Sequence, residues 1–369
     1  MKLGPSLLMM LCLLRHGLTR VPEECNLSLE TQRAVGGAIT QLGLKLLVNL
    51  QPGTEQPNVV LSPLSISLAL SQLALGARNE TEKQLLGALH AALLSDYYKT
   101  LSCLQEQLIL KAVKVASRIY LKPVLVFGSS GEWKSRFDSR FTTKDLFYID
   151  RQTSVKVDMM MGSKYPLSMF VDGEQGIQVA RFPFQRNISF LVVMPMQSEN
   201  LSRAAANLNI SELYRRLPNE IPMLVKLPKF KLEYKQDLQQ ALTSMGLGAL
   251  FSGPNLSGIA EGPLVVSGVQ HASSIELNEE GAQASAATSV TLVRTIPIFA
   301  VNMPFIFAIV DDVSHAPLFL GTVTNPNPGA TAELSDDPEI LRFLSSNMPS
   351  DKPQNDDPYW DNMLHDESQ

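Results

Sequence analysis

The segment with the clearest chemical potential is residues 281–295, in which a run of small, uncharged residues leads to a basic side chain. Residues 281–287 contain only Gly, Ala, Ser and one Gln, and Arg294 follows shortly after. Small side chains without proline or charge can enter a sheet between two strands and pair their backbone groups. An exposed arginine suits a trypsin-like protease, whose S1 pocket holds a carboxylate. The segment therefore predicts a cleavable bond at Arg294, attached to an insertable strand.

Both flanks of this segment have the composition of β-strands. Residues 264–277 run directly into the small residues and predict one strand. Residues 290–298 are rich in β-branched side chains and predict another. A flexible linker is the ordinary interpretation of a Gly-, Ala- and Ser-rich run, but two ordered flanks argue against it.

These features resemble the serpin family. Residues 281–295 are similar to the serpin hinge and reactive-centre loop. Residues 61–66 (LSPLSI) resemble the strand-to-helix segment below the central sheet, and residues 302–307 (NMPFIF) with 317–326 (PLFLGTVTNP) resemble the closing strand pair. The resemblance covers about residues 25 to 328, with one interruption. It implies an α+β serpin fold, with mixed β-sheets, a surrounding helical layer and an exposed reactive-centre loop.

The resemblance also implies roles for individual residues. It makes Arg294 and Thr295 the two sides of the reactive bond. It places Ser62, Ser65 and His271 in the polar cluster that holds the central sheet closed; taken alone, His271 predicts a hydrogen-bonded core histidine. The implied hinge comprises Glu279, Glu280, Gly281, Ala282, Ala284, Ala286, Ala287 and Thr288.

The resemblance breaks off after a strand predicted at residues 112–121. A serpin continues there with helices, an edge strand and a central strand, whereas only residues 122–132 precede Trp133 in this chain. The missing part includes the asparagine that completes the polar cluster. A central sheet without this strand has an open edge. We therefore expect an incomplete central sheet, and a skipped exon or a faulty gene model explains the gap best.

The N-terminus has the pattern of a secretory signal peptide. Residues 7–14 are apolar and lie between Lys2 and Arg15, and this run is too short to span a bilayer. The buried start of a helix is the alternative. We expect a signal peptide over residues 1–22, a serpin domain with an internal deletion over residues 23–326, and secretion into an extracellular fluid such as plasma.

Cysteines and glycosylation motifs fit an oxidising compartment. Cys12 lies in the predicted signal peptide, which leaves Cys25 and Cys103, and the family resemblance implies a disulfide between them. Two free thiols are the alternative. Six Asn-x-Ser/Thr motifs predict N-glycosylation, three of them favoured by the resemblance (Asn79, Asn187 and Asn200) and three carried by the motif alone (Asn26, Asn209 and Asn255).

The remaining sequence argues against an enzyme. The five histidines and the remaining cysteines show no metal-ligand spacing, so we expect no metal and no cofactor. Residues 246–251 lack the third glycine of a dinucleotide loop, and residues 128–131 are not a nucleophile elbow. The formal net charge of −5 gives no nucleic-acid footprint, and no later segment predicts a membrane span. We expect a monomer without catalytic residues.

Residues 327–369 form an acidic C-terminal tail. The tail has ten acidic residues against Arg342 and Lys352, and its composition predicts disorder. A subset of serpins carries a C-terminal extension that offers lysines to the kringle domains of plasmin. Lys352 is the tail's one lysine and thus the candidate contact for plasminogen kringles, while Tyr359 resembles a sulfation site. A solvated acidic tail without a partner is the alternative.

These observations leave two functions open. The first is a secreted inhibitor that acts as a suicide substrate of plasmin or another trypsin-like serine protease, with Arg294 at the cleaved bond. The second is a non-inhibitory or inactive serpin-like isoform or binding protein. Small side chains at residues 281–287 favour the first function, because bulky or charged ones would block insertion. The missing central strand favours the second.

Overall fold

The strands form one large and one small sheet in the computed structural model of the chain, which describes residues 25, 27–50, 53, 56–110, 132–196, 201–279 and 297–334. The larger sheet has the order β1-β11-β10-β5-β4-β3-β6-β9, with β2 and β12 also paired to β3, and the smaller sheet is the antiparallel pair of β7 and β8. The strands are β1 (Val59–Leu61), β2 (Thr143–Tyr148), β3 (Thr153–Asp172), β4 (Ile177–Pro183), β5 (Ile188–Pro195), β6 (Ile221–Pro228), β7 (Phe230–Asp237), β8 (Gln270–Leu277), β9 (Ile298–Ala300), β10 (Phe305–Asp311), β11 (Pro317–Val323) and β12 (Glu333–Leu334).

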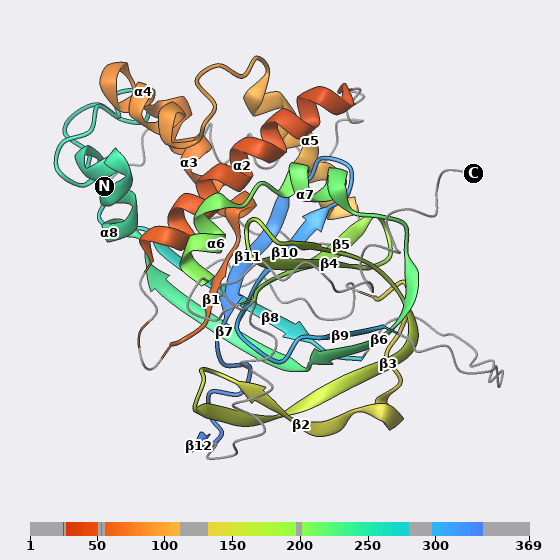
Figure 1. Cartoon of the computed structure of the whole chain (residues 1–369). Coiled ribbons are helices and arrows are strands. Elements are labelled where there is room, and N and C mark those ends of the chain that lie inside the picture. The colour runs from red at the N-terminus through yellow and green to blue at the C-terminus, as the bar shows by residue number, and fades with distance from the viewer. Residues whose placement is uncertain are drawn as a thin grey trace.

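Most helices gather on one side of the strands, as Figure 1 shows. Helix α2 (Leu29–Asn49) begins after Ser28, whose hydroxyl accepts the N–H of Thr31 at 3.0 Å and so caps the helix. Within the described ranges, no helix combines the length and apolarity needed to cross a lipid bilayer. The other helices are α3 (Pro63–Gly76), α4 (Asn79–Ala88), α5 (Tyr97–Leu110), α6 (Leu201–Asn207), α7 (Ile210–Arg216) and α8 (Gln239–Leu242), with single 3-10 or π turns at Ser139–Phe141, Thr243–Leu247 and Gly248–Phe251.

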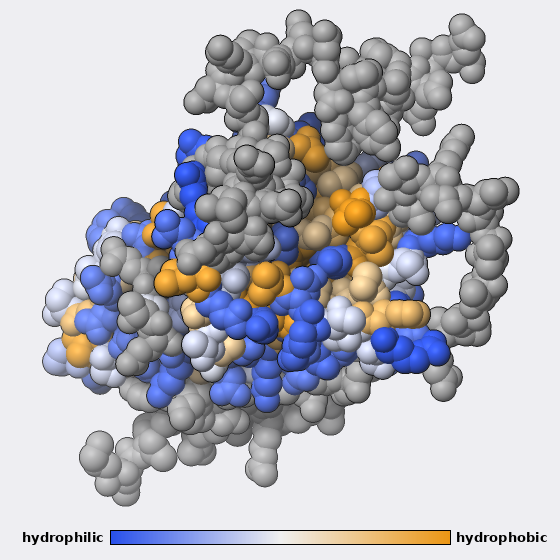
Figure 2. All heavy atoms as spheres, turned by 60° about the horizontal axis from the view of Figure 1, so that its bottom comes forward, coloured by the Kyte–Doolittle hydropathy of each residue, from blue (hydrophilic) through white to orange (hydrophobic). Residues whose placement is uncertain are grey.

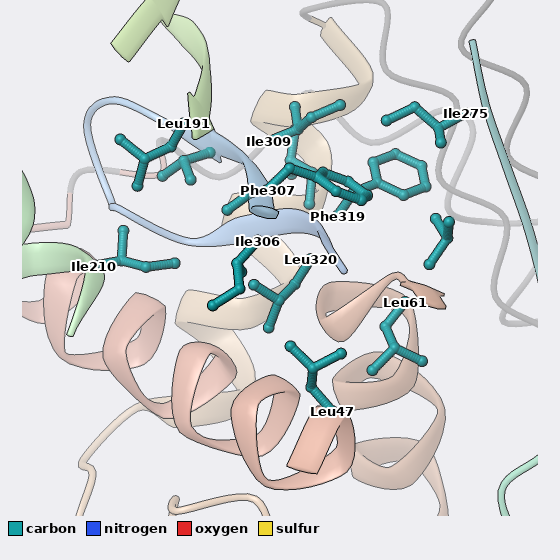
Figure 3. Close-up of a cluster of buried hydrophobic side chains, with 14 of the residues drawn as sticks. Leu47, Leu61, Leu191, Ile210, Ile275, Ile306, Phe307, Ile309, Phe319 and Leu320 are labelled. Carbon is teal, nitrogen blue, oxygen red and sulfur yellow. The ribbon is translucent and has the colours of Figure 1, made fainter. Parts of the chain in front are cut away.

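The main core lies where α2 and α3 meet strands β5, β10 and β11. Every residue of these three strands is buried, which agrees with their nearly continuous apolar sequences. Figure 3 shows Leu47 of α2 and Leu61 of β1 beside Ile306 and Leu320 of the β10–β11 hairpin. Burying a side chain of this size stabilises the fold by about 1.5–3 kcal/mol. The larger sheet therefore carries most of the apolar packing seen in the described chain.

Two glycines allow close contacts around this core. A Cβ atom on Gly36 of α2 would lie 2.1 Å from the carbonyl oxygen of Ser314, in the turn between β10 and β11. A Cβ atom on Gly321 of β11 would lie 2.0 Å from the carbonyl oxygen of Val59 in the neighbouring strand β1. Only glycine permits backbone contacts this close, so both positions fix how α2 and β1 approach the hairpin.

Figure 2 shows one face of the molecule, coloured by the hydropathy of each residue. The described surface there is mainly hydrophilic and carries several separate hydrophobic patches. Over the described chain as a whole, the exposed large hydrophobic residues include Phe141, Ile221 and Ile298. Scattered apolar side chains are normal on the surface of a folded protein and define no site by themselves.

The strand predicted over residues 264–277 is shorter in the structure. Strand β8 begins only at Gln270, so the prediction for residues 264–269 was wrong. Those residues bond to the segment after β7 instead: Leu238 N–H donates to the carbonyl oxygen of Val269 at 2.8 Å, and Val266 N–H donates to that of Leu250 at 3.0 Å. A segment whose partners are turns and short helices cannot join a strand ladder, although its apolar composition fits one.

The smaller sheet, formed by β7 and β8, corresponds to the central sheet that the sequence predicts to lack a strand. Among the described residues, β8 pairs only with β7, in a register that runs from Phe230 opposite Leu277 to Asp237 opposite Gln270. The strand predicted at residues 112–121 lies outside the described ranges. The second edge of β8 is therefore the edge against which an inserted strand would form its hydrogen bonds.

A disulfide fixes the N-terminal end of the fold. Cys25 and Cys103 are bonded, with their Cα atoms 5.7 Å apart and a sequence separation of 78 residues. Cys25 precedes α2, and Cys103 lies in α5. The bond therefore ties the start of the helix against which β11 packs to a helix that is distant in sequence.

We predict that Cys103→Ser lowers the free energy of unfolding by about 4–5 kcal/mol, the chain-entropy value for a loop of this length. Cys25→Ser should give the same loss, and the double variant should lose no more than either single variant. Denaturant unfolding of the oxidised proteins measures these differences. If the double variant lost the sum of the two single losses, the two sulfur atoms would contribute to stability separately, and not through one bond.

Candidate functional site

Residues 280–296 connect the two sheets. Strand β8 of the smaller sheet ends at Leu277, and β9 of the larger sheet begins at Ile298. The connecting residues lie outside the described ranges, and so do both predicted reactive-bond residues, Arg294 and Thr295. Of the predicted hinge residues, Glu279 alone is described. The structure therefore describes the two attachment points of the loop, at Glu279 and at Pro297.

Glu279 is held by two side chains from distant parts of the chain. The hydroxyl of Thr142, just before β2, donates to Glu279 Oε1 at 2.6 Å. Lys229, between β6 and β7, places Nζ 2.9 Å from Glu279 Oε2. The Glu279 side chain is only 12% exposed, whereas that of Lys229 is 43% exposed. These contacts fix a carboxylate at the start of the loop.

The surroundings of Glu279 favour the ionised carboxylate. Burial by itself raises the pKa of Glu279, but the hydrogen bonds from Thr142 and Lys229 outweigh burial, and the pKa is lowered. In turn, the hydrogen bond to Glu279 raises the pKa of Lys229. The two groups therefore carry opposite charges at neutral pH and attract each other across the base of the loop.

Trp133 ties the preceding residue to an aromatic core. Its indole Nε1–H donates to the carbonyl oxygen of Asn278 at 2.8 Å. The ring is 1% exposed and stacks on Phe184, with ring centroids 4.4 Å apart. Edge contacts are made with Phe137, Phe182 and Phe190. Asn278 and Glu279, which follow β8, are thus held by Trp133, Thr142 and Lys229, which come from three separate segments.

The other end of the loop is attached to the larger sheet. Leu224 N–H donates to the carbonyl oxygen of Pro297 at 2.9 Å, and β9 runs parallel to β6 with Ile298 opposite Leu224. Val301 N–H then donates to the carbonyl oxygen of Lys226 at 2.9 Å. The loop therefore begins in one sheet and ends in the other, and a cut within it frees its two halves from each other.

The predicted polar cluster forms where β1, α3 and β8 meet. The backbone N–H of Ser62 donates to His271 Nε2 at 3.3 Å, and Ser62 Oγ donates to Ser65 Oγ at 2.9 Å. His271 is 2% exposed, and burial lowers its pKa to about 4 against the opposing effect of a hydrogen bond to the backbone of Val60. The imidazole is therefore neutral at physiological pH, and its Nε2 acts as an acceptor.

Sequence reasoning missed three partners at these sites: Thr142, Lys229 and Ser273. The hydroxyl of Ser273 donates to the carbonyl oxygen of Val60 at 2.6 Å and joins β8 to β1 beside His271. The sequence did hold a signal for Ser273, because it lies two residues after His271 and residues two apart on a strand share a face. Thr142 and Lys229 follow no local pattern, so only the fold brings them to Glu279.

Four predicted glycosylation residues lie on the described surface: Asn79, Asn187, Asn209 and Asn255 are all exposed. Four other predicted site residues, Asn26, Asn200, Lys352 and Tyr359, lie outside the described ranges. In the described part of the chain, no three His, Cys, Asp or Glu side chains gather in a group that could hold a metal ion.

The folded arrangement and the sequence both match one known family. A family model described as Serpin (serine protease inhibitor) matches residues 37–130 and 107–326. The chain belongs to the serpin family. The match falls in two overlapping parts, and their overlap extends into the predicted interruption at residues 122–132.

Curated relatives support the same conclusion. Bovine alpha-2-antiplasmin is 37% identical over 85% of this chain and 77% of its own length. Mouse alpha-2-antiplasmin is 36% identical over 90% of this chain and 82% of its own length. Bovine pigment epithelium-derived factor is 27% identical over 79% and 87% of the two chains. These relatives confirm that the chain resembles alpha-2-antiplasmin over most of its length.

Solved structures confirm the fold. Mouse protein Z-dependent protease inhibitor matches with a TM-score of 0.65 and 22% identity, over 81% of this chain and 98% of its own. Uncleaved ovalbumin matches with a TM-score of 0.66 and 19% identity, over 79% of this chain and 100% of its own length. At such identities the similarity shows the fold alone, and that fold is the predicted α+β serpin fold.

The neutral His271 gives the stability of this chain a defined pH dependence. The pKa is about 4 in the folded chain and about 6.5 when unfolded, so the unfolded chain binds more protons between these values. The contribution of His271 is therefore complete above about pH 6.5 and is lost as the pH falls toward 4, by roughly 3 kcal/mol in all. His271→Gln should remove this part of the pH dependence. Denaturant unfolding of both proteins at pH 7, 6, 5 and 4 measures it, and parallel curves would contradict the prediction.

Proposed function

We propose that this serpin is a secreted suicide-substrate inhibitor of plasmin or another trypsin-like serine protease, cleaved between Arg294 and Thr295. The observation that carries the proposal is the fixed start of the loop: Asn278 and Glu279 are bound at the end of β8, and the small residues 281–287 follow at once. Antiplasmin relatives and the basic residue at the predicted bond support this class of target.

The chemistry of the first step belongs to the protease. Its serine oxygen attacks the carbonyl carbon of Arg294, the peptide bond to Thr295 breaks, and the new amine of Thr295 takes up a proton. An ester then joins Arg294 to the protease. Because β9 and β8 hold the two cut ends on different sheets, the Thr295 amine is free to move away from the ester.

The contribution of the inhibitor is movement of the acylated segment. Glu279 stays bound to Thr142 and Lys229, so the chain after it turns back and pairs antiparallel with the outer edge of β8. Residues 281–294 at about 3.3 Å each reach roughly 45 Å, which carries the attached protease across the domain. Each new backbone hydrogen bond contributes about 0.5–1.5 kcal/mol, and the distorted protease cannot complete hydrolysis of the ester.

A non-inhibitory serpin is the second candidate, and the small sheet favours it. Among the described residues β8 pairs only with β7, so an inserted strand would gain a partner on one side. Incubation of the secreted protein with plasmin separates the two functions. An SDS-resistant complex supports inhibition, whereas a cleaved product without complex shows a substrate and supports the second candidate.

We predict that Arg294→Ala lowers kcat/KM for plasmin cleavage of the loop by more than about 100-fold. The S1 carboxylate of the protease is left without its cation, which costs about 3–5 kcal/mol. Arg294→Lys is the matched control and should keep cleavage, because it retains a cation. N-terminal sequencing of the released fragment locates the bond. Equal cleavage of all three proteins would remove Arg294 from the reactive bond.

We predict that Ala286→Glu converts inhibition into plain cleavage. Insertion would bury a charge without a partner, at a cost of several kcal/mol, while attack at Arg294 is unaffected. Ala286→Ser is the control, since a small side chain still fits. Complex and cleaved product are quantified on denaturing gels at increasing ratios of inhibitor to protease. If wild type and Ala286→Glu form equal amounts of complex, the loop does not insert beside β8 at this position.

Other parts of the proposal rest on the sequence. Secretion follows from the predicted signal peptide at residues 1–22, and plasma is the proposed location. A plasminogen kringle contact through Lys352 and sulfation of Tyr359 stay predictions, because the acidic tail lies outside the described ranges after Leu334. Target choice through Arg294 does not depend on either.

A further inference from the structure

Four glycosylation motifs on the described surface differ in the accessibility of the hydroxyl group that the modifying enzyme needs. The acceptor is Asn-x-Ser/Thr, so the hydroxyl two residues after the asparagine must be accessible as well as the asparagine amide. All four asparagines are exposed, but the hydroxyl residues have different surroundings. These hydroxyl residues are Thr81 after Asn79, Ser189 after Asn187, Ser211 after Asn209 and Ser257 after Asn255.

The motif at Asn79 is closed by the fold. Thr81 is 6% exposed, and its hydroxyl accepts the backbone N–H of Asn255 at 2.9 Å. The loop that contains Asn255 is held there by two more bonds: Arg78 N–H donates to the carbonyl oxygen of Asn255 at 3.0 Å, and Gly258 N–H donates to that of Gly76 at 3.0 Å. The Thr81 hydroxyl is therefore reachable only before this loop packs against α4.

The motifs at Asn187 and Asn209 are also restricted. Ser189 lies in β5 and is completely buried, at 0% exposure. Ser211 is half-buried, with its hydroxyl 3.2 Å from His315 Nδ1. Asn209 itself caps α7, because its Oδ1 accepts the N–H of Glu212 at 3.2 Å. Modification at either site would require part of the fold to open.

The motif at Asn255 is open in the folded chain. Ser257 is exposed, and its hydroxyl and N–H donate to Asn255 Oδ1 at 2.8 and 3.3 Å. This local turn leaves the amide Nδ2 of Asn255 without a partner among the described residues and holds the hydroxyl beside it. The backbone of Asn255 is fixed by Arg78 and Thr81, so the turn is presented on a rigid support.

We infer that Asn255 is a glycosylation site that remains usable after folding, whereas Asn79 and Asn187 must be modified before their segments fold. In the reaction, Asn255 Nδ2 bonds to the anomeric carbon of a lipid-pyrophosphate-linked oligosaccharide, the lipid pyrophosphate leaves, and the amide loses one proton. The inference is independent of protease inhibition. It assigns an order of modification to sites that all match the Asn-x-Ser/Thr motif.

The test compares folded and unfolded full-length chain. Protein made without glycans is used in its folded, disulfide-bonded state, and a second portion is reduced, alkylated and unfolded. Both are incubated with purified oligosaccharyltransferase and a lipid-linked oligosaccharide. Glycans are then removed by peptide N-glycosidase in H₂¹⁸O, and mass spectrometry of the peptides measures occupancy at each asparagine.

In the folded protein, Asn255 should be modified at least about ten times more than Asn79 or Asn187, a difference of about 1.4 kcal/mol or more in accessibility. In the unfolded protein, the three occupancies should become similar. Ser257→Ala should abolish modification of Asn255 in both states. Thr81→Ser gives all three sites an Asn-x-Ser motif and keeps a hydroxyl for the bond to Asn255, so the order of modification in the folded protein should stay the same. Equal modification of Asn79 and Asn255 in the folded protein would overturn the inference, and so would absence of modification at Asn255.

Discussion

The attachment of Glu279 at the end of β8 is the contact on which the proposed inhibition depends. A carboxylate at 12% exposure is costly to bury, and the cost is offset only because Thr142 and Lys229 both donate to it. Neither donor is close to Glu279 in sequence. Thr142 is placed by β2 and Lys229 by the turn between β6 and β7, so the larger sheet must be formed before the hinge of the smaller sheet is fixed.

The small sheet decides whether a fixed hinge produces inhibition. A strand that inserts between two strands gains hydrogen bonds on both edges, whereas one that adds to β8 alone gains them on one. At about 0.5–1.5 kcal/mol for each net bond, this halves the backbone contribution to insertion. Release of the protease by hydrolysis competes with insertion in time. A weaker drive therefore shifts the outcome from trapped complex toward cleaved substrate, even when Arg294 and the hinge are intact.

The sequence predicted those parts of the site whose signal is local or is carried by family resemblance. Strands β10 and β11 overlap the two segments that resemble the closing strand pair, and the change from β1 to α3 occurs at Ser62, as the resemblance implied. The contact between Ser62 and His271, 209 residues apart, was predictable only through the family. Composition failed at residues 264–269, because their hydrogen-bond partners are turns rather than a strand. It also gave no sign of Lys229, whose role depends on the meeting of two sheets.

Stability and inhibition are located in different parts of this chain. The packing of α2 and α3 on β5, β10 and β11 belongs to the larger sheet, and nothing in it requires a third strand beside β8. The polar cluster of Ser62, Ser65 and His271 joins β8 to the junction of β1 and α3, so the two-stranded sheet stays attached to that core. The described part of the chain therefore keeps its core and its disulfide without a third strand beside β8. A strand inserted beside β8 would need a second edge to gain hydrogen bonds on both sides, so membership of the serpin family does not by itself establish inhibition by the serpin mechanism.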